Sequence, residues 1–279
     1  MRDFKDKTVV ITGAGSGIGR ALAVELAGKG AKLALSDVDS VGLAETVARC
    51  DKKGVKALGY DLDVADRAAV EAHADKVVSE FGGANVIVNN AGVSLAATVE
   101  DMTWEDFDWL FNIDFWGVAH GTKAFLPHLI ASGDGHVVNV SSVFGLMGIP
   151  SQSAYNAAKF AVRGFTESLR QEMLIAGHKV GVTCVHPGGI KTNIVTNGRG
   201  AGATPEEIAE AGRQFQKIAF TRPEGAAKAI LRGVRWNRPR VLIGPDARVF
   251  DGIPRLVGPR YEDVVGHLGR ITGAANRMP

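Results

Sequence analysis

Short apolar runs alternate with longer stretches of helical periodicity along nearly the whole chain. The short runs predict strands at 8–12, 32–36, 55–59, 85–89, 136–141, 179–185 and 240–243. The stretches between them predict helices near 18–29, 40–52, 66–81, 103–130, 153–176, 204–217 and 224–235. Strands and helices that alternate in this way predict a doubly wound α/β fold, in which helices cover both faces of a parallel sheet.

The segments Val86-Ile87-Val88 and Val137-Val138 are continuously apolar, which is typical of strands buried on both faces. Sheets of this kind bind ligands beyond the carboxyl ends of their strands, where the strand order reverses. The 279 residues suit one large domain, which we place at 1–245 with a substrate-side loop and helices at about 188–220. Residues 246–279 then form a C-terminal extension.

Composition argues against several classes of protein. Hydrophobic residues make up 46% of the chain and charged residues 22%, so an ordinary globular protein is expected. The charged N-terminus lacks the apolar stretch of a signal peptide, and no apolar run approaches the length of a membrane helix. Cys50 and Cys184 lie far apart and the histidines are scattered, so we expect buried thiols, a cytoplasmic location and no metal.

The net charge of +2 is unevenly spread along the chain. Residues 221–279 hold eleven Lys or Arg against five Asp or Glu, a surplus of six, so residues 1–220 carry a deficit of four. A basic tail could contact an anionic substrate carrier, an acidic partner or a membrane surface, although a solvated rim is the commoner interpretation. No motif indicates nucleic-acid binding.

A glycine-rich turn follows the first predicted strand. Its sequence, Gly13-Ala14-Gly15-Ser16-Gly17-Ile18-Gly19, fits the spacing G-x-x-x-G-x-G and not G-x-G-x-x-G, because position 18 is isoleucine. Glycines in such a turn let an anion approach the backbone N–H groups at the start of the next helix. The turn therefore favours a pyrophosphate site, unless it serves only to reverse the chain.

Asp37 ends the second predicted strand, 24 residues after Gly13. A carboxylate at this distance can accept hydrogen bonds from an adenosine ribose, and it repels a 2′-phosphate. Neither Ser16 nor Val38 is a cation that could attract that phosphate. NAD is therefore favoured over NADP, unless Asp37 merely caps the next helix.

Tyr155 and Lys159 lie four residues apart in a predicted helix and so share one face. A phenol is a poor acid or base near neutral pH, because its ordinary pKa is about 10. An ammonium close by favours the phenolate and brings the pKa toward the working range. The pair therefore predicts proton transfer to or from an alcohol oxygen.

Ser142 stands thirteen residues before Tyr155, at the end of a predicted strand. Its hydroxyl could hydrogen-bond a substrate oxygen as charge develops there, or it could simply end the strand. It is not part of a G-x-S-x-G elbow, which argues against a serine hydrolase.

Taken together, these motifs resemble the short-chain dehydrogenase/reductase family in its single-domain form, over roughly residues 5–245. The matching residues, in the family's order, are Thr12-Gly13-x-x-x-Gly17-Ile18-Gly19, Asn89-Asn90-Ala91-Gly92, Asn112, Ser142, Tyr155-x-x-x-Lys159 and Pro187-Gly188. The resemblance implies a Rossmann fold with a seven-stranded, mostly parallel sheet of order 3-2-1-4-5-6-7.

The resemblance also implies a role for each matching residue. Tyr155 would be the catalytic acid/base, and Lys159 would lower its pKa and bind the nicotinamide ribose. Ser142 would orient and polarise the substrate oxygen. Asn112 would lie at a helix irregularity and hold a water that joins Lys159 to solvent.

Cofactor contacts follow from the same resemblance. Asp63 and Val64 would contact the adenine, Asn90-Ala91-Gly92 the adenosine-ribose side, and Pro187-Gly188-Gly189-Ile190-Lys191-Thr192 the carboxamide and pyrophosphate. The predicted NAD-binding residues are Gly13, Ser16, Gly17, Ile18, Gly19, Asp37, Asp63, Val64, Asn90, Ala91, Gly92, Tyr155, Lys159, Pro187, Gly188, Ile190 and Thr192.

The expected substrate is a hydrophobic secondary alcohol or ketone, because the segments that should surround it are mostly apolar. Candidate wall residues are Leu95, Val143, Phe144, Leu146, Met147, Ile149, Ile194 and Val195, about half of which could instead be ordinary core. The extension could form a flap over the substrate entrance or pack on another subunit. A homodimer or homotetramer is expected, through helices at 103–130 and 153–176. Apolar contacts could come from Phe160, Val162, Phe165 and Leu169, although several of these must also face the sheet.

The main functional hypothesis is an NAD(H)-dependent oxidoreductase that interconverts such an alcohol and ketone. A 3-oxoacyl thioester reductase is the alternative among enzymes; the basic tail would suit an acidic carrier, whereas Asp37 argues against the NADPH such reductases commonly use. A non-catalytic dinucleotide sensor is the alternative from another class. It is disfavoured because Asn112, Ser142, Tyr155 and Lys159 are all present.

Overall fold

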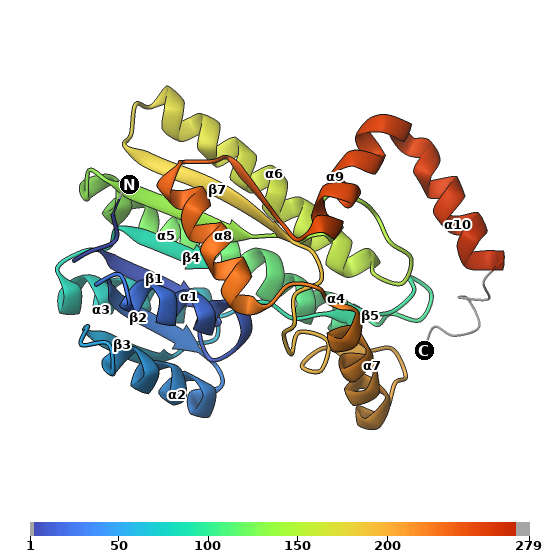
Figure 1. Cartoon of the computed structure of the whole chain (residues 1–279), viewed down its shortest axis with the longest axis horizontal. Helices are drawn as coiled ribbons and strands as arrows, with labels where there is room; N and C mark the ends of the chain where they lie inside the picture. The colour runs from blue at the N-terminus through green and yellow to red at the C-terminus, as the bar shows by residue number, and fades with distance from the viewer. Residues whose placement is uncertain (1–2, 272–279) are drawn as a thin grey trace.

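The computed structural model describes residues 3–271. Its central sheet has seven strands in the order β3-β2-β1-β4-β6-β7-β9, and every neighbouring pair is parallel (Figure 1). The strands are β1 (Thr8–Thr12), β2 (Lys32–Asp37), β3 (Ala57–Asp61), β4 (Val86–Asn89), β6 (Gly135–Val140), β7 (Val180–Pro187) and β9 (Arg240–Ile243). Numbered within this sheet, the order is the predicted 3-2-1-4-5-6-7, so the doubly wound α/β fold is confirmed.

The third strand lies two residues later than predicted. The apolar pattern placed it at 55–59, whereas β3 extends through Tyr60 to Asp61. Pairing with β2 decides this boundary, because the register continues to Asp37 opposite Asp61. A polar strand end stabilised by backbone pairing leaves no hydrophobic signal in the sequence.

Two hydrophobic clusters lie on opposite faces of the sheet, and β1 alternates between them. Val9 and Ile11 join the cluster under α1 (Gly17–Ala27), α2 (Ser40–Asp51) and α8 (Pro223–Arg235). Val10 joins the other cluster, under α3 (Arg67–Phe81), α5 (Gly117–Ala131) and α6 (Ser153–Ile175). The two-residue period of a strand therefore supplies both halves of the core.

The helical stretch predicted over 103–130 is not one continuous α-helix. It divides into α4 (Trp104–Phe111), a π-helical segment η1 (Asn112–Trp116) and α5. In η1 the Gly117 N–H donates to the carbonyl oxygen of Asn112, five residues back. The extra residue in this turn changes which side chains of the segment face the sheet, and such π segments are frequent at functional sites.

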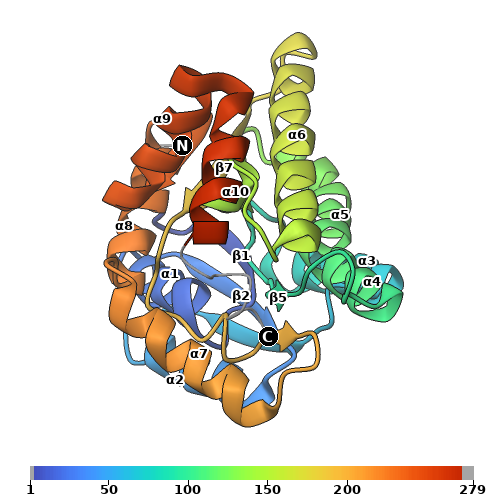
Figure 2. The ribbon, with the colours of Figure 1, turned by 90° about the vertical axis from the view of Figure 1, so that its right-hand side faces the viewer.

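Several elements gather beyond the carboxyl ends of the strands, on the right of Figure 1 and toward the viewer in Figure 2. A second, two-stranded sheet joins β5 (Leu95–Ala96) to β8 (Arg199–Gly200), and α7 (Pro205–Ile218) confirms the helix predicted near 204–217. Short 3₁₀ turns occur at η2 (Val143–Gly145) and η3 (Gly258–Arg260). The C-terminal extension forms α9 (Pro245–Val257) and α10 (Tyr261–Ile271), two helices that the sequence pattern did not predict.

Candidate active site

The glycine turn is packed so closely that side chains are excluded from it. Gly13 has φ +65°, and a Cβ on it would lie 2.7 Å from the Cα of Ala91. A Cβ on Gly19 would lie 2.0 Å from the carbonyl oxygen of Gly13. Both glycines are therefore required for the turn to sit against the segment that follows β4.

Asn90 and Thr12 hold these two segments together. The Thr12 hydroxyl accepts hydrogen bonds from the N–H groups of Asn90 (3.0 Å) and Ala91 (3.1 Å). The Asn90 amide donates to the carbonyl oxygens of Thr12 and Gly13, both at 3.0 Å. The Asn90 side chain thus stabilises the glycine turn.

The start of α1 suits an anion. Its N-cap residue Ser16 makes no side-chain capping bond, and its first turn contains no acidic residue. Thr192 lies beside it, since a Cβ on Gly17 would be 3.1 Å from the Thr192 methyl carbon. Uncapped N–H groups, a turn free of side chains and an adjacent hydroxyl together fit a pyrophosphate.

Asp37 lies against the same turn. Its Oδ2 accepts the Gly15 N–H at 2.7 Å, and its Oδ1 accepts the Asp39 N–H at 2.9 Å. Of the predicted adenine contacts, Asp63 is exposed, whereas Val64 is buried against the start of α5. Two backbone N–H groups therefore hold the carboxylate of Asp37 next to the glycine turn.

Arg20 supports the turn from behind, a role that no sequence signal indicated. Its guanidinium donates to the carbonyl oxygens of Gly15 and Gly42 and to the Thr46 hydroxyl, the last two at 3.1 and 3.0 Å. It also pairs with Glu45 at 3.1 Å. These contacts connect the glycine turn to α2.

Tyr155, Lys159 and Ser142 meet at the carboxyl end of β6. Tyr155 is 8% exposed and Lys159 3%, and the Lys159 Nζ lies 5.4 Å from the centroid of the Tyr155 ring. The Ser142 hydroxyl hydrogen-bonds the phenol of Tyr155 and accepts the Phe144 N–H at 3.1 Å. The structure therefore brings these three predicted residues together.

Asp114 belongs to the same cluster, although the sequence reasoning did not single it out. Its Oδ2 lies 3.0 Å from Lys159 Nζ, and its Oδ1 accepts the Val93 N–H at 2.8 Å. Asn112, two residues earlier, lies in the predicted helix irregularity but is exposed. A charged residue inside the apolar segment Ile113-Asp114-Phe115-Trp116 was the signal that could have identified Asp114.

The three buried ionisable groups shift one another's pKa. Burial raises the pKa of Tyr155; Lys159 and the Ser142 hydrogen bond lower it, Asp114 raises it, and the net direction is upward. Burial lowers the pKa of Lys159, but Asp114 and Tyr155 raise it by more than burial lowers it. The net direction is upward, so the lysine stays charged. Lys159 therefore acts on Tyr155 in the predicted direction, but burial and Asp114 outweigh it.

Asn156 holds the loop that should face the substrate. Its amide donates to the carbonyl oxygens of Phe144 (2.6 Å) and Met147 (3.0 Å), and its Oδ1 accepts the Ile149 N–H at 3.1 Å. Because Asn156 follows Tyr155 on α6, the acid/base candidate and the loop are positioned by the same helix turn.

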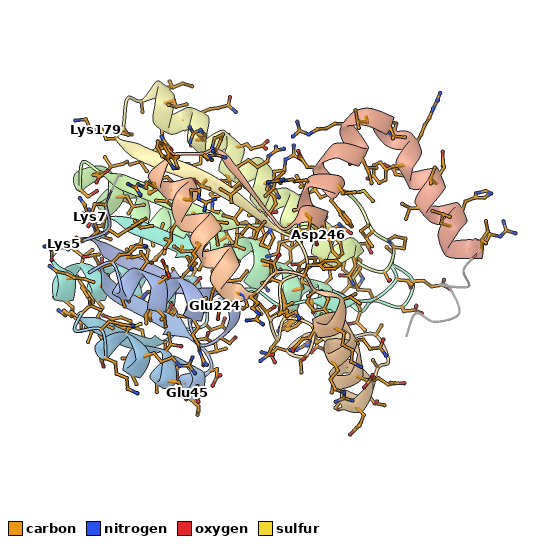
Figure 3. All side chains as sticks on the ribbon, viewed as in Figure 1. Lys5, Lys7, Glu45, Lys179, Glu224 and Asp246 are labelled. Carbon is orange, nitrogen blue, oxygen red and sulfur yellow. The ribbon has the colours of Figure 1, made fainter. Side chains whose placement is uncertain are left out.

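The segment after β7 is held by β9 and by the C-terminal extension. The Gly188 N–H donates to the Ile243 carbonyl oxygen at 2.9 Å, and the Gly189 N–H donates to Asp246 Oδ2 at 2.6 Å. Asp246 lies in the first turn of α9, at the base of the extension (Figure 3). Ile190 is buried and Thr192 partly exposed. Residues more than fifty positions apart thus shape the predicted nicotinamide segment.

The extension also contacts the loop after β6. The Phe250 ring packs on Phe144 at 6.1 Å, and Phe144 meets Tyr155 edge to face at 6.0 Å. The Tyr261 hydroxyl accepts the Gly148 N–H at 3.1 Å. A cavity of about 400 Å³ lies between this loop and α10. These contacts favour the flap hypothesis for the extension.

Other predicted residues divide by burial. Among the candidate walls, Leu95, Val143, Leu146 and Met147 are buried, whereas Phe144, Ile149, Ile194 and Val195 are partly exposed. Among the candidate subunit contacts, Val162 and Leu169 are buried within the protein, so they cannot contact a second subunit. Several of the four were expected to face the sheet, and the burial of these two agrees with that. Phe160 is 40% exposed and stays a candidate.

Replacing Tyr261 by Phe should raise the substrate KM about threefold to tenfold, because the Gly148 N–H loses its acceptor and the loop loosens. The dissociation constant of the nicotinamide cofactor should not change. Val264→Ala on the exposed face of α10 is the matched control. Steady-state kinetics of both variants test this. An unchanged KM in Tyr261→Phe would show that the extension does not contribute to substrate binding.

Comparison with known proteins agrees with this geometry. The family model for short chain dehydrogenase matches residues 7–201. The putative oxidoreductase SadH of Mycobacterium tuberculosis is 53% identical over 268 residues, which cover 95% of this chain and 96% of SadH. The C alpha-dehydrogenase of Sphingobium sp. is 34% identical over 285 residues, with 97% and 93% coverage.

A solved structure gives the same result. The short chain dehydrogenase/reductase from Burkholderia phymatum in complex with NAD has a TM-score of 0.83 and 34% identity, and covers 95% of this chain and 96% of its own. Fold, glycine turn and these matches place the chain among oxidoreductases that use a nicotinamide dinucleotide. It belongs to the short-chain dehydrogenase/reductase family, as its motifs predicted.

No helix within residues 3–271 is both long and apolar enough to cross a bilayer. No group of His, Cys, Asp and Glu side chains in this described part could hold a metal ion.

Proposed function

We propose that this protein is an NAD(H)-dependent oxidoreductase that interconverts a hydrophobic secondary alcohol and the corresponding ketone. The observation that carries the proposal is the buried contact of Tyr155 with Ser142 and Lys159. This cluster lies next to a glycine turn that fits a pyrophosphate. A proton donor and a dinucleotide site at the same edge of a parallel sheet suit hydride transfer.

The bound cofactor would supply or accept the hydride at the substrate carbon. In reduction, Tyr155 gives its phenolic proton to the carbonyl oxygen while Ser142 orients that oxygen by a hydrogen bond. The carbon gains a hydride and the oxygen a proton, so an alcohol forms and the phenol becomes a phenolate. Lys159 stabilises the phenolate until it is protonated again. Alcohol oxidation follows the same steps in reverse.

Asp37 supports NAD as the cofactor. Its carboxylate is held beside Gly15 by two backbone N–H groups, so it cannot swing away from a phosphate on the ribose. The resulting repulsion would disfavour NADP. The nearest side chains in sequence, Ser36 and Val38, carry no positive charge.

A hydrophobic substrate is supported by the residues around the phenol. Phe144 packs on Tyr155, and Ile149, Ile194 and Val195 are partly exposed in the adjacent loops. The 34% identical relative from Sphingobium sp. is named a dehydrogenase, which supports an oxidoreductase reaction for this protein as well.

The direct test is a panel of secondary alcohols and ketones with each cofactor, followed by absorbance of the reduced nicotinamide. We expect turnover of apolar substrates with NAD(H). Turnover restricted to 3-oxoacyl thioesters with NADPH would favour the thioester reductase instead. Absence of turnover across the panel, with NADH still bound, would favour a dinucleotide sensor.

We also propose that the protein is a homo-oligomer. Trp116 in η1 and Phe160 on α6 are 47% and 40% exposed, and large apolar side chains of this kind are suited to subunit contact. Light scattering should therefore give a dimer or tetramer mass, and a monomer mass would contradict the proposal.

A further inference from the structure

We infer that Asp114 is a positioning residue that holds Lys159 and neutralises its charge, so that Tyr155 rests as a protonated phenol ready to donate. This inference rests on the proposed function, because it concerns the proton that Tyr155 transfers. It makes Asp114 the residue that contacts Lys159 directly, whereas the sequence predicted Asn112 as the fourth member of the cluster.

The contacts of Asp114 are those of a counterion. Its two oxygens face two donors, the Lys159 ammonium at 3.0 Å and the Val93 N–H at 2.8 Å. The side chains of Asp114 and Lys159 are 0% and 4% exposed, so water does not screen the pair. The only other acceptor near Lys159 Nζ in the described part of the chain is the Val140 carbonyl oxygen, at 3.5 Å. The ion pair therefore determines where the ammonium lies.

The backbone around the pair leaves room for it. A Cβ on Gly92 would lie 3.2 Å from Asp114 Oδ1 and 3.4 Å from Lys159 Nζ. The π-helical turn of η1 orients Asp114 inward while Asn112 stays exposed. A glycine on one side and an irregular helix on the other thus flank this ion pair.

The consequence for Tyr155 is electrostatic. A lone buried ammonium would attract the phenolate strongly, because the interior screens charge weakly. A carboxylate at hydrogen-bond distance makes the pair neutral overall and repels a phenolate. Burial raises the pKa of Tyr155, and among the charged groups only Lys159 lowers it while Asp114 raises it. The resting phenol therefore keeps its proton, which suits ketone reduction at neutral pH.

The other titratable groups around the cluster stay neutral in the relevant range. Burial lowers the pKa of His186 on β7 to about 4, and its Nδ1 donates to the Ser142 carbonyl oxygen at 2.8 Å. Burial raises the pKa of Cys184 on β7 to about 12. The more distant charges of Arg163, Glu167 and Arg240 also act on the pKa values of Cys184 and His186. Among the charged groups around Tyr155, Asp114 and Lys159 are therefore the two that act on its pKa, in addition to burial.

The test is a titration of Tyr155 in the cofactor-free protein by tyrosinate absorbance. The chain has three tyrosines, so subtracting the matching Tyr155→Phe spectrum isolates this one. Asp114→Asn keeps the shape and an acceptor for the Val93 N–H but removes the charge. We expect its Tyr155 titration midpoint to fall by about one pH unit or more relative to the wild type. An unchanged or higher midpoint would overturn the inference.

A double substitution keeps the test informative if Asp114→Asn leaves Lys159 unpaired and the protein fails to fold. Asp114→Asn combined with Lys159→Met removes both charges, so Tyr155 should titrate close to its wild-type midpoint. Lys159→Met alone should keep Tyr155 protonated to higher pH than the wild type. A double variant that titrates at least one pH unit below the wild type would contradict the role of the ion pair.

Asp108→Asn is the matched control, because Asp108 is an exposed aspartate on the adjoining helix α4. It should leave the titration unchanged. In kinetics, the rising limb of alcohol oxidation against pH should move to lower pH in Asp114→Asn alone. A shifted titration without turnover of any alcohol would overturn the proposed function and leave the inference standing. Turnover of alcohols without a shifted titration would overturn the inference about Asp114 and leave the proposed function standing.

Discussion

Replacing Tyr155 by Phe should lower kcat for ketone reduction by about 10³-fold, because the substrate oxygen loses its proton donor. The ring itself should stay in place, since it packs edge to face on Phe144 at 6.0 Å. The dissociation constant of NADH, measured by fluorescence titration, should change by less than about twofold, because the glycine turn and Asp37 are untouched.

Tyr60→Phe is the matched control for this substitution. Tyr60 lies on β3, and its hydroxyl hydrogen-bonds Glu80 on α3. Three strands separate β3 from β6, where the Tyr155 cluster lies. The control should reduce the free energy of unfolding slightly and leave kcat unchanged. Full activity in Tyr155→Phe would exclude the phenol as acid/base and would leave only a dinucleotide-binding fold.

Replacing Asp37 by Asn should raise the preference for NADP over NAD about 30-fold in kcat/KM. The carboxylate lies next to the glycine turn, where a 2′-phosphate on the ribose would meet it. Removing one charge relieves a repulsion of about 2 kcal/mol at partly screened distances. Asn keeps an oxygen for the Asp39 N–H but loses the acceptor of the Gly15 N–H together with the charge. Initial rates with both cofactors at fixed substrate measure it.

Asp39→Asn is the control for Asp37. Asp39 accepts the Gly42 N–H as the N-cap of α2, and asparagine caps helices equally well. It removes a like charge two residues away without loosening the helix. A preference shift as large as that of Asp37→Asn would show that general surface charge, and not the position of Asp37, selects the cofactor.

Local sequence patterns were sufficient for most of the fold. Apolar runs placed all seven strands of the central sheet within two residues at each end, and only the third was shifted by two residues at both ends. The Tyr155–Lys159 spacing placed both side chains on one helix face, because that depends only on the helical repeat. The third strand was displaced because its polar end, Asp61, is stabilised by pairing with β2 and not by burial.

The C-terminal extension shows where pattern reading fails. Residues 245–257 and 261–271 form helices, yet large apolar side chains such as Leu256 and Ile271 are 88% and 76% exposed. The apolar residues of this segment do recur at helical spacing, but Gly252, Pro254 and Gly258-Pro259 interrupt it and argue against a helix. Its contacts with Gly148, Phe144 and Gly189 depend on the path of the chain across the sheet edge.

The sequence by itself determined the glycine turn, the carboxylate after the second strand and the phenol–ammonium pair, because each depends on residues near one another along the chain. Only the tertiary structure decided that Asp114 neutralises Lys159 and that Asp246 holds the segment after β7. These contacts join residues 45 and 57 positions apart, and no local periodicity reports which distant side chains share a buried site. Charge balance around Tyr155 is therefore a property of the folded chain.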